Sequence, residues 1–234
     1  MTGNERMSRG IDDAARIGNT LMVFFRYPVK GHVKTRLARE MGDDAALKVY
    51  KTLLRYTVDI VKDLEGVDIL LVYEARGGKS LPRGVLMEGW AEVRQADGDM
   101  GQRFLDAFRH ALDNSAKAVI IGTDCIGLSK EIIDEAFDAL EKDDVVIGPS
   151  EDGGYYLIGM KGLIYAEVIF TGIPWGTDKV FERTMEKMDR LRIKVHRLPK
   201  LFDVDTVKDW ERSLKADPRL KAMQELVEKD RGWA

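Results

Sequence analysis

Short runs of apolar, largely β-branched residues alternate with longer segments of helical spacing along most of this chain, and this alternation constrains the fold most strongly. The apolar runs, which we predict to be strands, are residues 20–26, 67–73, 91–95, 117–122, 144–148, 154–160 and 192–198. The predicted helices are residues 43–63, 101–114, 129–141, 177–190 and 206–229, the last broken at Pro218. Strands that are apolar throughout are buried on both faces, so we expect a mostly parallel, doubly wound α/β sheet flanked by helices.

The length and apolar content of the chain fit one hydrophobic core. With 234 residues, of which 44% are hydrophobic, we expect a single domain over residues 20–234. The first 19 residues are polar and mixed in charge. They predict a flexible N-terminal extension, without the apolar run of a signal peptide or membrane anchor.

Charge and cysteine content exclude several classes of function. A net charge of -3 argues against general nucleic-acid binding, which depends on neutralising many phosphates. One cysteine, Cys125, permits neither an internal disulfide framework nor a zinc site built from CxxC pairs, and it fits a reducing, cytoplasmic compartment. We expect Cys125 to be a small buried apolar residue rather than a nucleophile, and we assign no catalytic role to the three histidines.

Charged or glycine-containing segments directly follow four of the predicted strands. These segments are RYPVKGHVKTR, GTDC, PSEDGGYY and PKLFDVDT. In doubly wound sheets, ligands bind at the carboxyl ends of the strands. We therefore expect the four segments to converge on one site.

The segment after the first strand is basic and contains no acid. Its cations are Arg26, Lys30, Lys34, Arg36 and Arg39. It is not a Walker loop, because Pro28 stands where that motif needs glycine. We predict instead that Gly31 permits a turn, that amides up to Thr35 face phosphate oxygens, and that Lys34 and Arg36 neutralise a diphosphate. The alternative is a solvated basic loop.

Three aspartates are candidate metal ligands. Asp124 ends an apolar strand, where a carboxylate needs a cationic partner, and Asp203 and Asp205 share one face of an extended segment. Mg²⁺ or Mn²⁺ is usually held by one or two carboxylates, while substrate phosphates complete the octahedron. We predict Asp124 and Asp205 as ligands and leave Asp203 as an equal alternative to Asp205. Either Asp205 or Thr206 could instead cap the helix that follows.

Six motifs, taken in order, resemble a bacterial family of GT-A-fold, nucleotide-diphospho-sugar-transferase-like proteins over residues 20–214. They are R-x-P-x-x-G-x-x-K-T-R, G-D-M-G-Q-R, G-T-D-C, E-D-G-G-Y-Y-L-I-G, I-P-W-G-T and D-V-D-T. This family is more distantly similar to the 2-phospholactate guanylyltransferases. The resemblance implies a Rossmann-like GT-A fold and a nucleotide bound through a divalent metal. It places the family's basic motif on Arg26, Lys34 and Arg36, its metal-type aspartate on Asp124, and its late acidic motif on Asp203 and Asp205. The chain departs from the family at Ile126, where proline usually follows GTDC.

Two of these motifs contain candidates for contact with the transferred group or its acceptor. In EDGGYYLIG, Asp152 is a candidate base with Glu151 as its substitute. Gly153 and Gly154 would let the backbone approach a sugar or acceptor closely beside Tyr155, although the pair could equally be a tight turn. In IPWGT, Trp175 either stacks on a pyranose or base or is a buried anchor.

The GDMGQR motif lies at a predicted helix start. Gly101 and Arg103 would offer an amide and a guanidinium to an anion or to ribose, unless this segment is only a surface helix start.

The motifs together predict an enzyme that transfers a glycosyl group from a nucleotide diphosphosugar to a small-molecule acceptor. The alternative is a nucleotidyltransferase that joins a nucleoside triphosphate to a phosphorylated acceptor, since such an acceptor needs little base catalysis. A nucleotide-binding module without turnover fits the intact carboxylates less well. A haloacid-dehalogenase-type phosphatase should have its DVDT motif on the first strand rather than at residue 203. We expect no membrane span and allow for a homo-oligomer.

Overall fold

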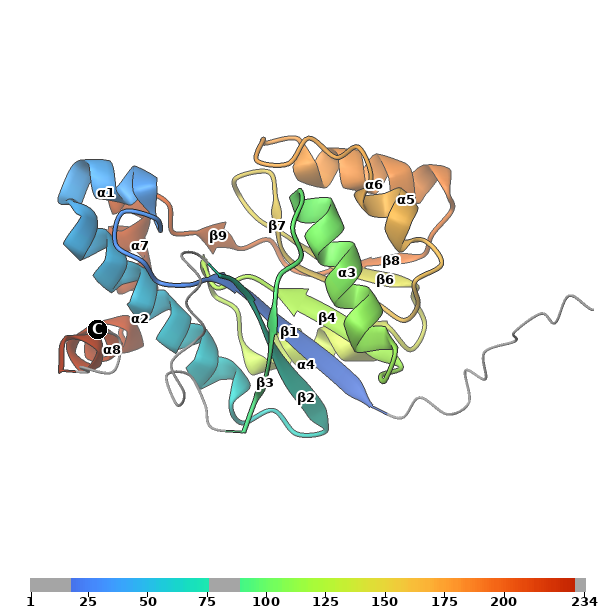
Figure 1. Cartoon of the computed structure of the whole chain (residues 1–234), viewed down its shortest axis with the longest axis horizontal. Coiled ribbons are helices and arrows are strands. Elements are labelled where there is room, and N and C mark those ends of the chain that lie inside the picture. Colours follow the sequence, from blue (N-terminus) through green and yellow to red (C-terminus); the bar gives the residue numbers. More distant parts are fainter. Residues whose placement is uncertain (1–17, 76–88, 230–234) are drawn as a thin grey trace, which may run out of the picture.

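The structure is a computed structural model that describes residues 18–75 and 89–229. Seven strands of this part form one sheet in the order β3-β2-β1-β4-β7-β6-β8 (Figure 1). In addition, β5 pairs with β9 in a separate two-stranded sheet. The strands are β1 (Asn19–Arg26), β2 (Val67–Glu74), β3 (Ala91–Arg94), β4 (Lys117–Ile121), β5 (Cys125–Ile126), β6 (Val145–Pro149), β7 (Tyr155–Met160), β8 (Val195–Arg197) and β9 (Phe202–Asp203). The predicted single-domain, mostly parallel α/β fold is confirmed.

One strand of the seven-stranded sheet runs against the others. β7 is antiparallel to both β4 and β6, whereas the remaining neighbours in the sheet are parallel. β7 follows β6 through a tight turn at residues 150–154, because antiparallel strands can be joined directly. This turn therefore lies at the carboxyl edge of β6, on the same side as the loops that follow the parallel strands.

Helices cover both faces of the sheet. They are α1 (Thr35–Met41), α2 (Asp43–Val61), α3 (Met100–Leu112), α4 (Lys130–Ala139), α5 (Ala166–Phe170), α6 (Val180–Arg190), α7 (Val207–Ala216) and α8 (Arg219–Lys229). Buried residues of α2, α4, α7 and α8 belong to one core, and those of α3, α5 and α6 belong to the other. In Figure 1, α1, α2, α7 and α8 accordingly lie together, apart from α3, α5 and α6.

The central strand explains why the apolar runs are continuous. Leu21, Val23 and Phe25 of β1 pack into one core, and Met22 and Phe24 pack into the other. Successive side chains of a strand point to opposite faces, so a strand covered on both sides must be apolar at every position. The strand itself lies inside the protein, and only its ends reach solvent.

The predicted boundaries differ from the observed ones mainly at short elements. α1, α5, β5 and β9 were not predicted, because segments this short show no clear period. The predicted helix over 177–190 begins only at Val180; Thr177 accepts a hydrogen bond from the Lys179 amide in the turn before it. The expected break at Pro218 is confirmed, since it separates α7 from α8. The predicted N-terminal extension lies outside the described residues except for its last two.

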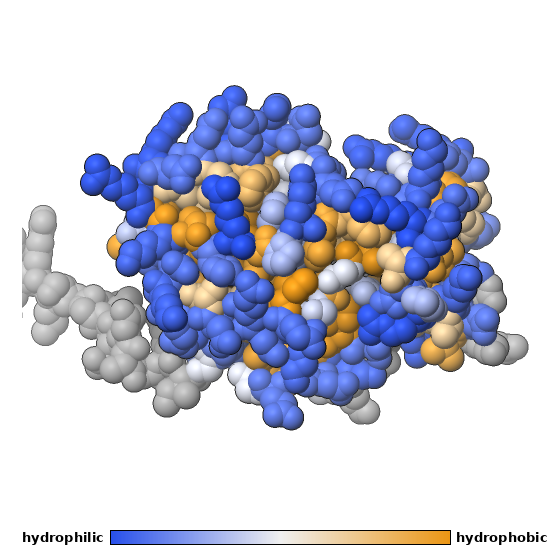
Figure 2. All heavy atoms as spheres, turned by 180° about the vertical axis from the view of Figure 1, so that it is seen from behind, coloured by the Kyte–Doolittle hydropathy of each residue, from blue (hydrophilic) through white to orange (hydrophobic). Residues whose placement is uncertain are grey.

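The back of the molecule shows both polar and apolar side chains (Figure 2). Seen from behind (Figure 2), charged and polar side chains project from the molecule, and apolar residues show mainly in the recesses between them. Of the helices in the described ranges, none combines the length and apolar character needed to span a bilayer.

Candidate active site

A cavity of about 740 Å³ opens at the carboxyl ends of β1, β2 and β4. Its size lies within the range typical of sites for small molecules and cofactors. Segments that are far apart in the chain contribute to its walls. Of the predicted site residues, those that line it are Arg26, Lys34, Thr35, Arg36, Arg103, Asp124, Asp152, Gly154, Tyr155, Trp175 and Asp205.

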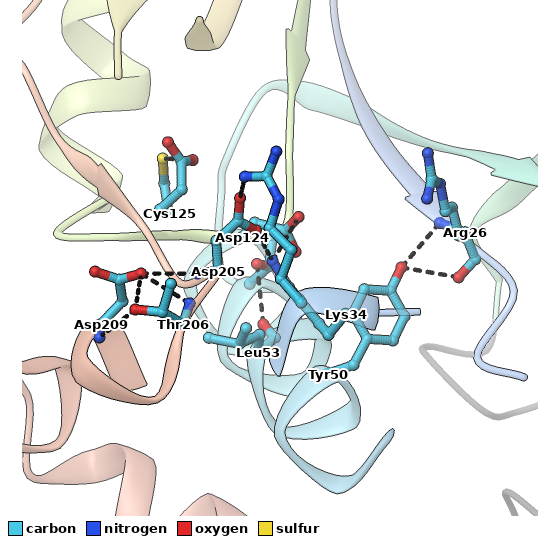
Figure 3. Close-up of polar contacts among 12 residues, drawn as sticks. Arg26, Lys34, Tyr50, Leu53, Asp124, Cys125, Asp205, Thr206 and Asp209 are labelled. Atoms are coloured by element: carbon cyan, nitrogen blue, oxygen red, sulfur yellow. Dashed lines mark hydrogen bonds and ion pairs between the residues drawn. The ribbon is translucent and has the colours of Figure 1, made fainter. Parts of the chain in front are cut away.

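The basic loop and two of the predicted acids meet in this cavity. The ammonium of Lys34 lies 3.0 Å from Asp124 Oδ2 and 3.3 Å from Asp205 Oδ1 (Figure 3). Arg36 Nη1 lies 3.0 Å from Asp205 Oδ2. Three of the four segments expected to converge, RYPVKGHVKTR, GTDC and PKLFDVDT, therefore meet in this cavity, and Lys34 of the basic loop is not solvated.

The Lys34 side chain is almost completely buried, with 4% of its surface exposed. Burial opposes its charge, but the carboxylates of Asp124 and Asp205 outweigh that effect and raise the pKa of Lys34 above its usual value. Lys34 is therefore a cation at neutral pH. Without these carboxylates the buried ammonium would be an uncompensated charge, so its burial depends on Asp124 and Asp205, whose side chains are 43% and 36% exposed.

Asp205 is free to make these contacts because another residue caps the next helix. Thr206 is the N-cap of α7 and forms a capping box with Asp209. The Thr206 hydroxyl accepts from the Asp209 amide, and the Asp209 carboxylate accepts from the Thr206 amide (Figure 3). Of the two capping alternatives, Thr206 is the one observed.

Asp203 lies next to this cluster but does not line the cavity. It is on β9 and pairs in register with Cys125 of β5, whose thiol donates to Asp203 Oδ1 at 2.7 Å. Burial raises the pKa of Asp203 to about 6, and the carboxylates of Asp152 and Asp124 add to this effect. As expected, Cys125 is buried.

The donor set fits a divalent cation that is held only in part by the protein. Asp124 Oδ1 and Asp203 Oδ2 are buried and have no hydrogen-bond partner among the described residues. No group of three or more Asp, Glu, His or Cys side chains in residues 18–75 and 89–229 has an arrangement suited to a metal. Two carboxylates completed by substrate phosphates are the usual environment of Mg²⁺. Asp124 with Asp205 or Asp203 remains our predicted ligand set.

The turn between β6 and β7 holds Asp152 at the rim of the cavity. Its Oδ1 accepts from the Ser150 hydroxyl and from the Gly154 amide. Glu151, the predicted substitute, forms a bidentate ion pair with Arg212 that lowers the pKa of Glu151. Glu151 does not line the cavity, so Asp152 is the better placed of the two carboxylates.

Aromatic rings form one wall of the cavity. Tyr155 and Trp175 have ring centroids 6.4 Å apart, and Phe104 of α3 lies 6.2 Å and 5.7 Å from them. Gly101, which does not line the cavity, explains part of this packing. A Cβ at Gly101 would come within 2.5 Å of the Phe170 carbonyl and 3.0 Å of Trp175 Nε1. The absence of a side chain at Gly101 therefore allows α3 to approach Trp175.

Two other predicted glycines shape loops rather than walls. Gly31 and Gly153 do not line the cavity. Gly153 has φ of +88°, and a Cβ there would lie 2.2 Å from the carbonyl oxygen of Asp178. The amide of Phe181 also donates to the Gly153 carbonyl. Gly153 therefore fixes the turn that carries Asp152 against the start of α6.

Sequence reasoning missed a polar network at the ends of β2 and β3. Glu74 forms ion pairs with Arg26 at 3.1 Å and with Arg103 at 3.6 Å. Arg103 also donates to Gln95 Oε1, and Gln95 donates to the carbonyls of Phe25 and Val72. Glu74 and Gln95 line the cavity. The sequence did hold one indication of this role, because both residues stand at the carboxyl end of a predicted strand.

Tyr50 of α2 was also missed, and it fixes the start of the basic loop. Its hydroxyl accepts from the Arg26 amide at 2.8 Å and donates to the Arg26 carbonyl at 2.9 Å (Figure 3). Tyr50 is buried and lines the cavity. The sequence held no sign of this role, because Tyr50 stands on the apolar face of the predicted helix, where an aromatic residue is expected for packing alone.

We expect Tyr50→Phe to lower the free energy of unfolding by about 2 kcal/mol, because two backbone groups of Arg26 lose their partner. Urea unfolding measures this change. Tyr156→Phe is a matched control: it removes one hydrogen bond, to the Pro199 carbonyl at 3.1 Å, and should cost about 1 kcal/mol. Equal losses in the two variants would contradict the role assigned to Tyr50.

This fold, with a cavity at its carboxyl edge, defines a GT-A-like protein, a class that comprises nucleotide-diphospho-sugar transferases and nucleotidyltransferases. A model of the family described as "Uncharacterized protein conserved in bacteria (DUF2064)" matches residues 57–177. The chain belongs to this family.

Solved structures support the same class. The chain is 30% identical to a proposed nucleotide-diphospho-sugar transferase from Desulfovibrio desulfuricans G20, with a TM-score of 0.78 over 89% of this chain and 97% of that one. A cytidylyltransferase from Leptospira borgpetersenii serovar Hardjo-bovis is 15% identical, with a TM-score of 0.55 over 93% and 96% of the two chains. A manganese complex of Rv0371C from Mycobacterium tuberculosis H37Rv is 15% identical, with a TM-score of 0.51 over 85% and 98%. The predicted GT-A-like resemblance is confirmed. None of the curated proteins compared with the chain matches it.

Proposed function

We propose that the protein is a metal-dependent glycosyltransferase whose donor is a nucleoside diphosphosugar and whose acceptor is a small molecule. One observation carries this proposal: Lys34 and Arg36 lie with Asp124 and Asp205 in one cavity. Cations beside carboxylates that can share a divalent ion are suited to a diphosphate. The likeness to a proposed nucleotide-diphospho-sugar transferase supports this choice.

In this mechanism the acceptor hydroxyl oxygen forms a bond to the anomeric carbon of the sugar. The bond from that carbon to the diphosphate oxygen breaks, and the departing nucleoside diphosphate keeps the electron pair. Lys34 and Arg36 stabilise the negative charge that develops on it. Asp152 accepts the proton of the acceptor hydroxyl.

A bound divalent metal would supply Lewis-acid stabilisation of the same leaving group. Asp124 would hold it together with Asp205 or Asp203, and the aromatic wall of Tyr155 and Trp175 would contact the sugar or the acceptor. The manganese complex of a protein with the same fold supports a divalent ion, Mn²⁺ or Mg²⁺.

Nucleotidyl transfer is the second candidate, and the surroundings of Asp152 favour it. Asp152 is exposed, and its Oδ1 already accepts two hydrogen bonds within its own turn, so this oxygen is not free to accept a proton from an acceptor hydroxyl. A phosphorylated acceptor would need little base catalysis. The cytidylyltransferase of the same fold is consistent with this reaction.

A ligand panel separates the two reactions. We expect UDP-, GDP-, CDP- or TDP-sugars to raise the melting temperature only when Mn²⁺ or Mg²⁺ is present, in line with ligand linkage. CTP, GTP and UTP form the comparison set. If the triphosphates stabilise the protein and the nucleotide sugars do not, and if pyrophosphate is released during turnover, the glycosyltransferase is rejected in favour of the nucleotidyltransferase.

A further inference from the structure

We infer that this site takes its divalent ion together with the diphosphate rather than as a free ion, and that Lys34 imposes this order. The inference rests on the proposed function, because it takes a diphosphate to be the ligand. It concerns what the buried ammonium does before the substrate arrives.

The first observation is the position of Lys34. Its ammonium contacts one oxygen of Asp124 and one of Asp205, at 3.0 Å and 3.3 Å. These two carboxylates are the ones that would have to share an ion. The lysine therefore acts as an internal counter-cation between the predicted ligands.

The backbone at Lys34 directs the side chain to this place. Lys34 has φ of 48° and ψ of 49°, and Arg192 is the only other non-glycine residue with positive φ in the described ranges. This left-handed conformation is costly for a residue with a side chain, so tertiary contacts must stabilise it. The ion pairs of the buried ammonium with Asp124 and Asp205 are such contacts.

The second observation is the charge of the cluster. Lys34 and Arg36 balance Asp124 and Asp205, so the cluster of these four ion-paired side chains carries no net charge. A divalent ion entering alone would give it two uncompensated positive charges in a partly buried place, beside an ammonium. A diphosphosugar carries one negative charge on each phosphate, so ion and diphosphate together leave the cluster neutral. A triphosphate would leave it negative.

The third observation is that the cluster keeps an unused acceptor. Asp124 Oδ1 is buried and has no hydrogen-bond partner among the described residues, although its Oδ2 is held by Lys34. Buried carboxylate oxygens are normally satisfied. A metal bound to phosphate oxygens would use this atom, while Lys34 gains a phosphate oxygen as a new partner. Metal and diphosphate binding are thus coupled through one side chain.

The test measures Mn²⁺ binding without turnover. Mn²⁺ is titrated alone and followed by electron paramagnetic resonance of the unbound ion, for the wild type and for Lys34→Met. We expect Lys34→Met to bind Mn²⁺ alone at least about tenfold more tightly, because the competing cation is gone. Lys30→Met is the matched control, since Lys30 lies on the same loop and pairs with the exposed Asp44. It should bind Mn²⁺ as the wild type does.

Melting temperatures provide the second measurement. The probe is P¹,P²-dimethyl diphosphate, which carries one negative charge on each phosphate, as a diphosphosugar does. In the wild type, Mn²⁺ with this diphosphate should raise the melting temperature more than the separate effects of the two added together, and in Lys34→Met this excess should shrink. Circular dichroism checks that each variant is folded, and Lys34→Gln replaces Lys34→Met if the latter is not.

Unchanged Mn²⁺ affinity in a folded Lys34 variant overturns the inference, and so does tight binding of Mn²⁺ alone by the wild type. Neither result depends on sugar transfer. The proposed glycosyltransferase reaction would instead fail in the panel of nucleotide sugars, so the two failures can be told apart.

Discussion

Asp124→Asn should reduce transfer activity by about 10³-fold and abolish stabilisation by divalent ions, while the protein stays folded. The amide has the size of the carboxylate but lacks its charge, so Lys34 loses one of its two anionic partners and the metal loses a predicted ligand. Asp205 still pairs with Lys34, which keeps the structural cost moderate. Melting curves with and without Mn²⁺ measure the metal effect, and initial rates measure the transfer.

Asp44→Asn is the control for this prediction. Asp44 also pairs with a lysine of the basic loop, Lys30, but its side chain is 83% exposed and it does not line the cavity. Exposed ion pairs contribute little, so neither activity nor metal-dependent stabilisation should change. If Asp124→Asn kept the metal-dependent rise in melting temperature, Asp124 would have to be removed from the ligand set.

Gly153→Ala should destabilise the protein by about 3 kcal/mol, through a left-handed backbone that disfavours a side chain and through steric overlap. The new Cβ would lie 2.2 Å from the Asp178 carbonyl oxygen, which belongs to backbone and cannot rotate away. For a chain of this length we expect the melting temperature to fall by roughly 10 °C. Differential scanning calorimetry measures the change.

Gly172→Ala separates the two causes. Gly172 also has positive φ, +65°, but a Cβ there would meet nothing within 4 Å. Gly172→Ala should lower the free energy of unfolding by only about 1 kcal/mol, because only the unfavourable backbone conformation contributes. Similar losses in both variants would mean that the turn before β7 moves freely away from α6, against the packing described above.

The sequence was sufficient to predict the sheet and the meeting of its loops. Continuous apolar runs predict strands buried on both faces, and the rule that ligands bind at carboxyl ends brought Lys34, Asp124 and Asp205 to one edge. Chain order and burial are enough to place these residues at one edge of the sheet, whatever path each loop takes.

The antiparallel course of β7 and the partners of individual side chains could not be predicted in this way. Nothing in the apolar run at 154–160 distinguishes a strand of one direction from the other. The network of Glu74, Gln95 and Arg103 depends on how the ends of β2 and β3 lie against α3. The Lys34 ammonium between two aspartates depends on a left-handed backbone that residue preferences argue against.

The pairing of β5 with β9 bears on how the protein matures. Cys125 lies opposite Asp203, and the Val204 amide donates to the Asp124 carbonyl, so both acidic loops are joined by backbone bonds across nearly eighty positions of chain. During synthesis the first loop leaves the ribosome long before the second. A nascent chain can complete its large sheet and still lack Asp205, the second carboxylate that pairs with Lys34, so competence for ligand should arrive last and in one step.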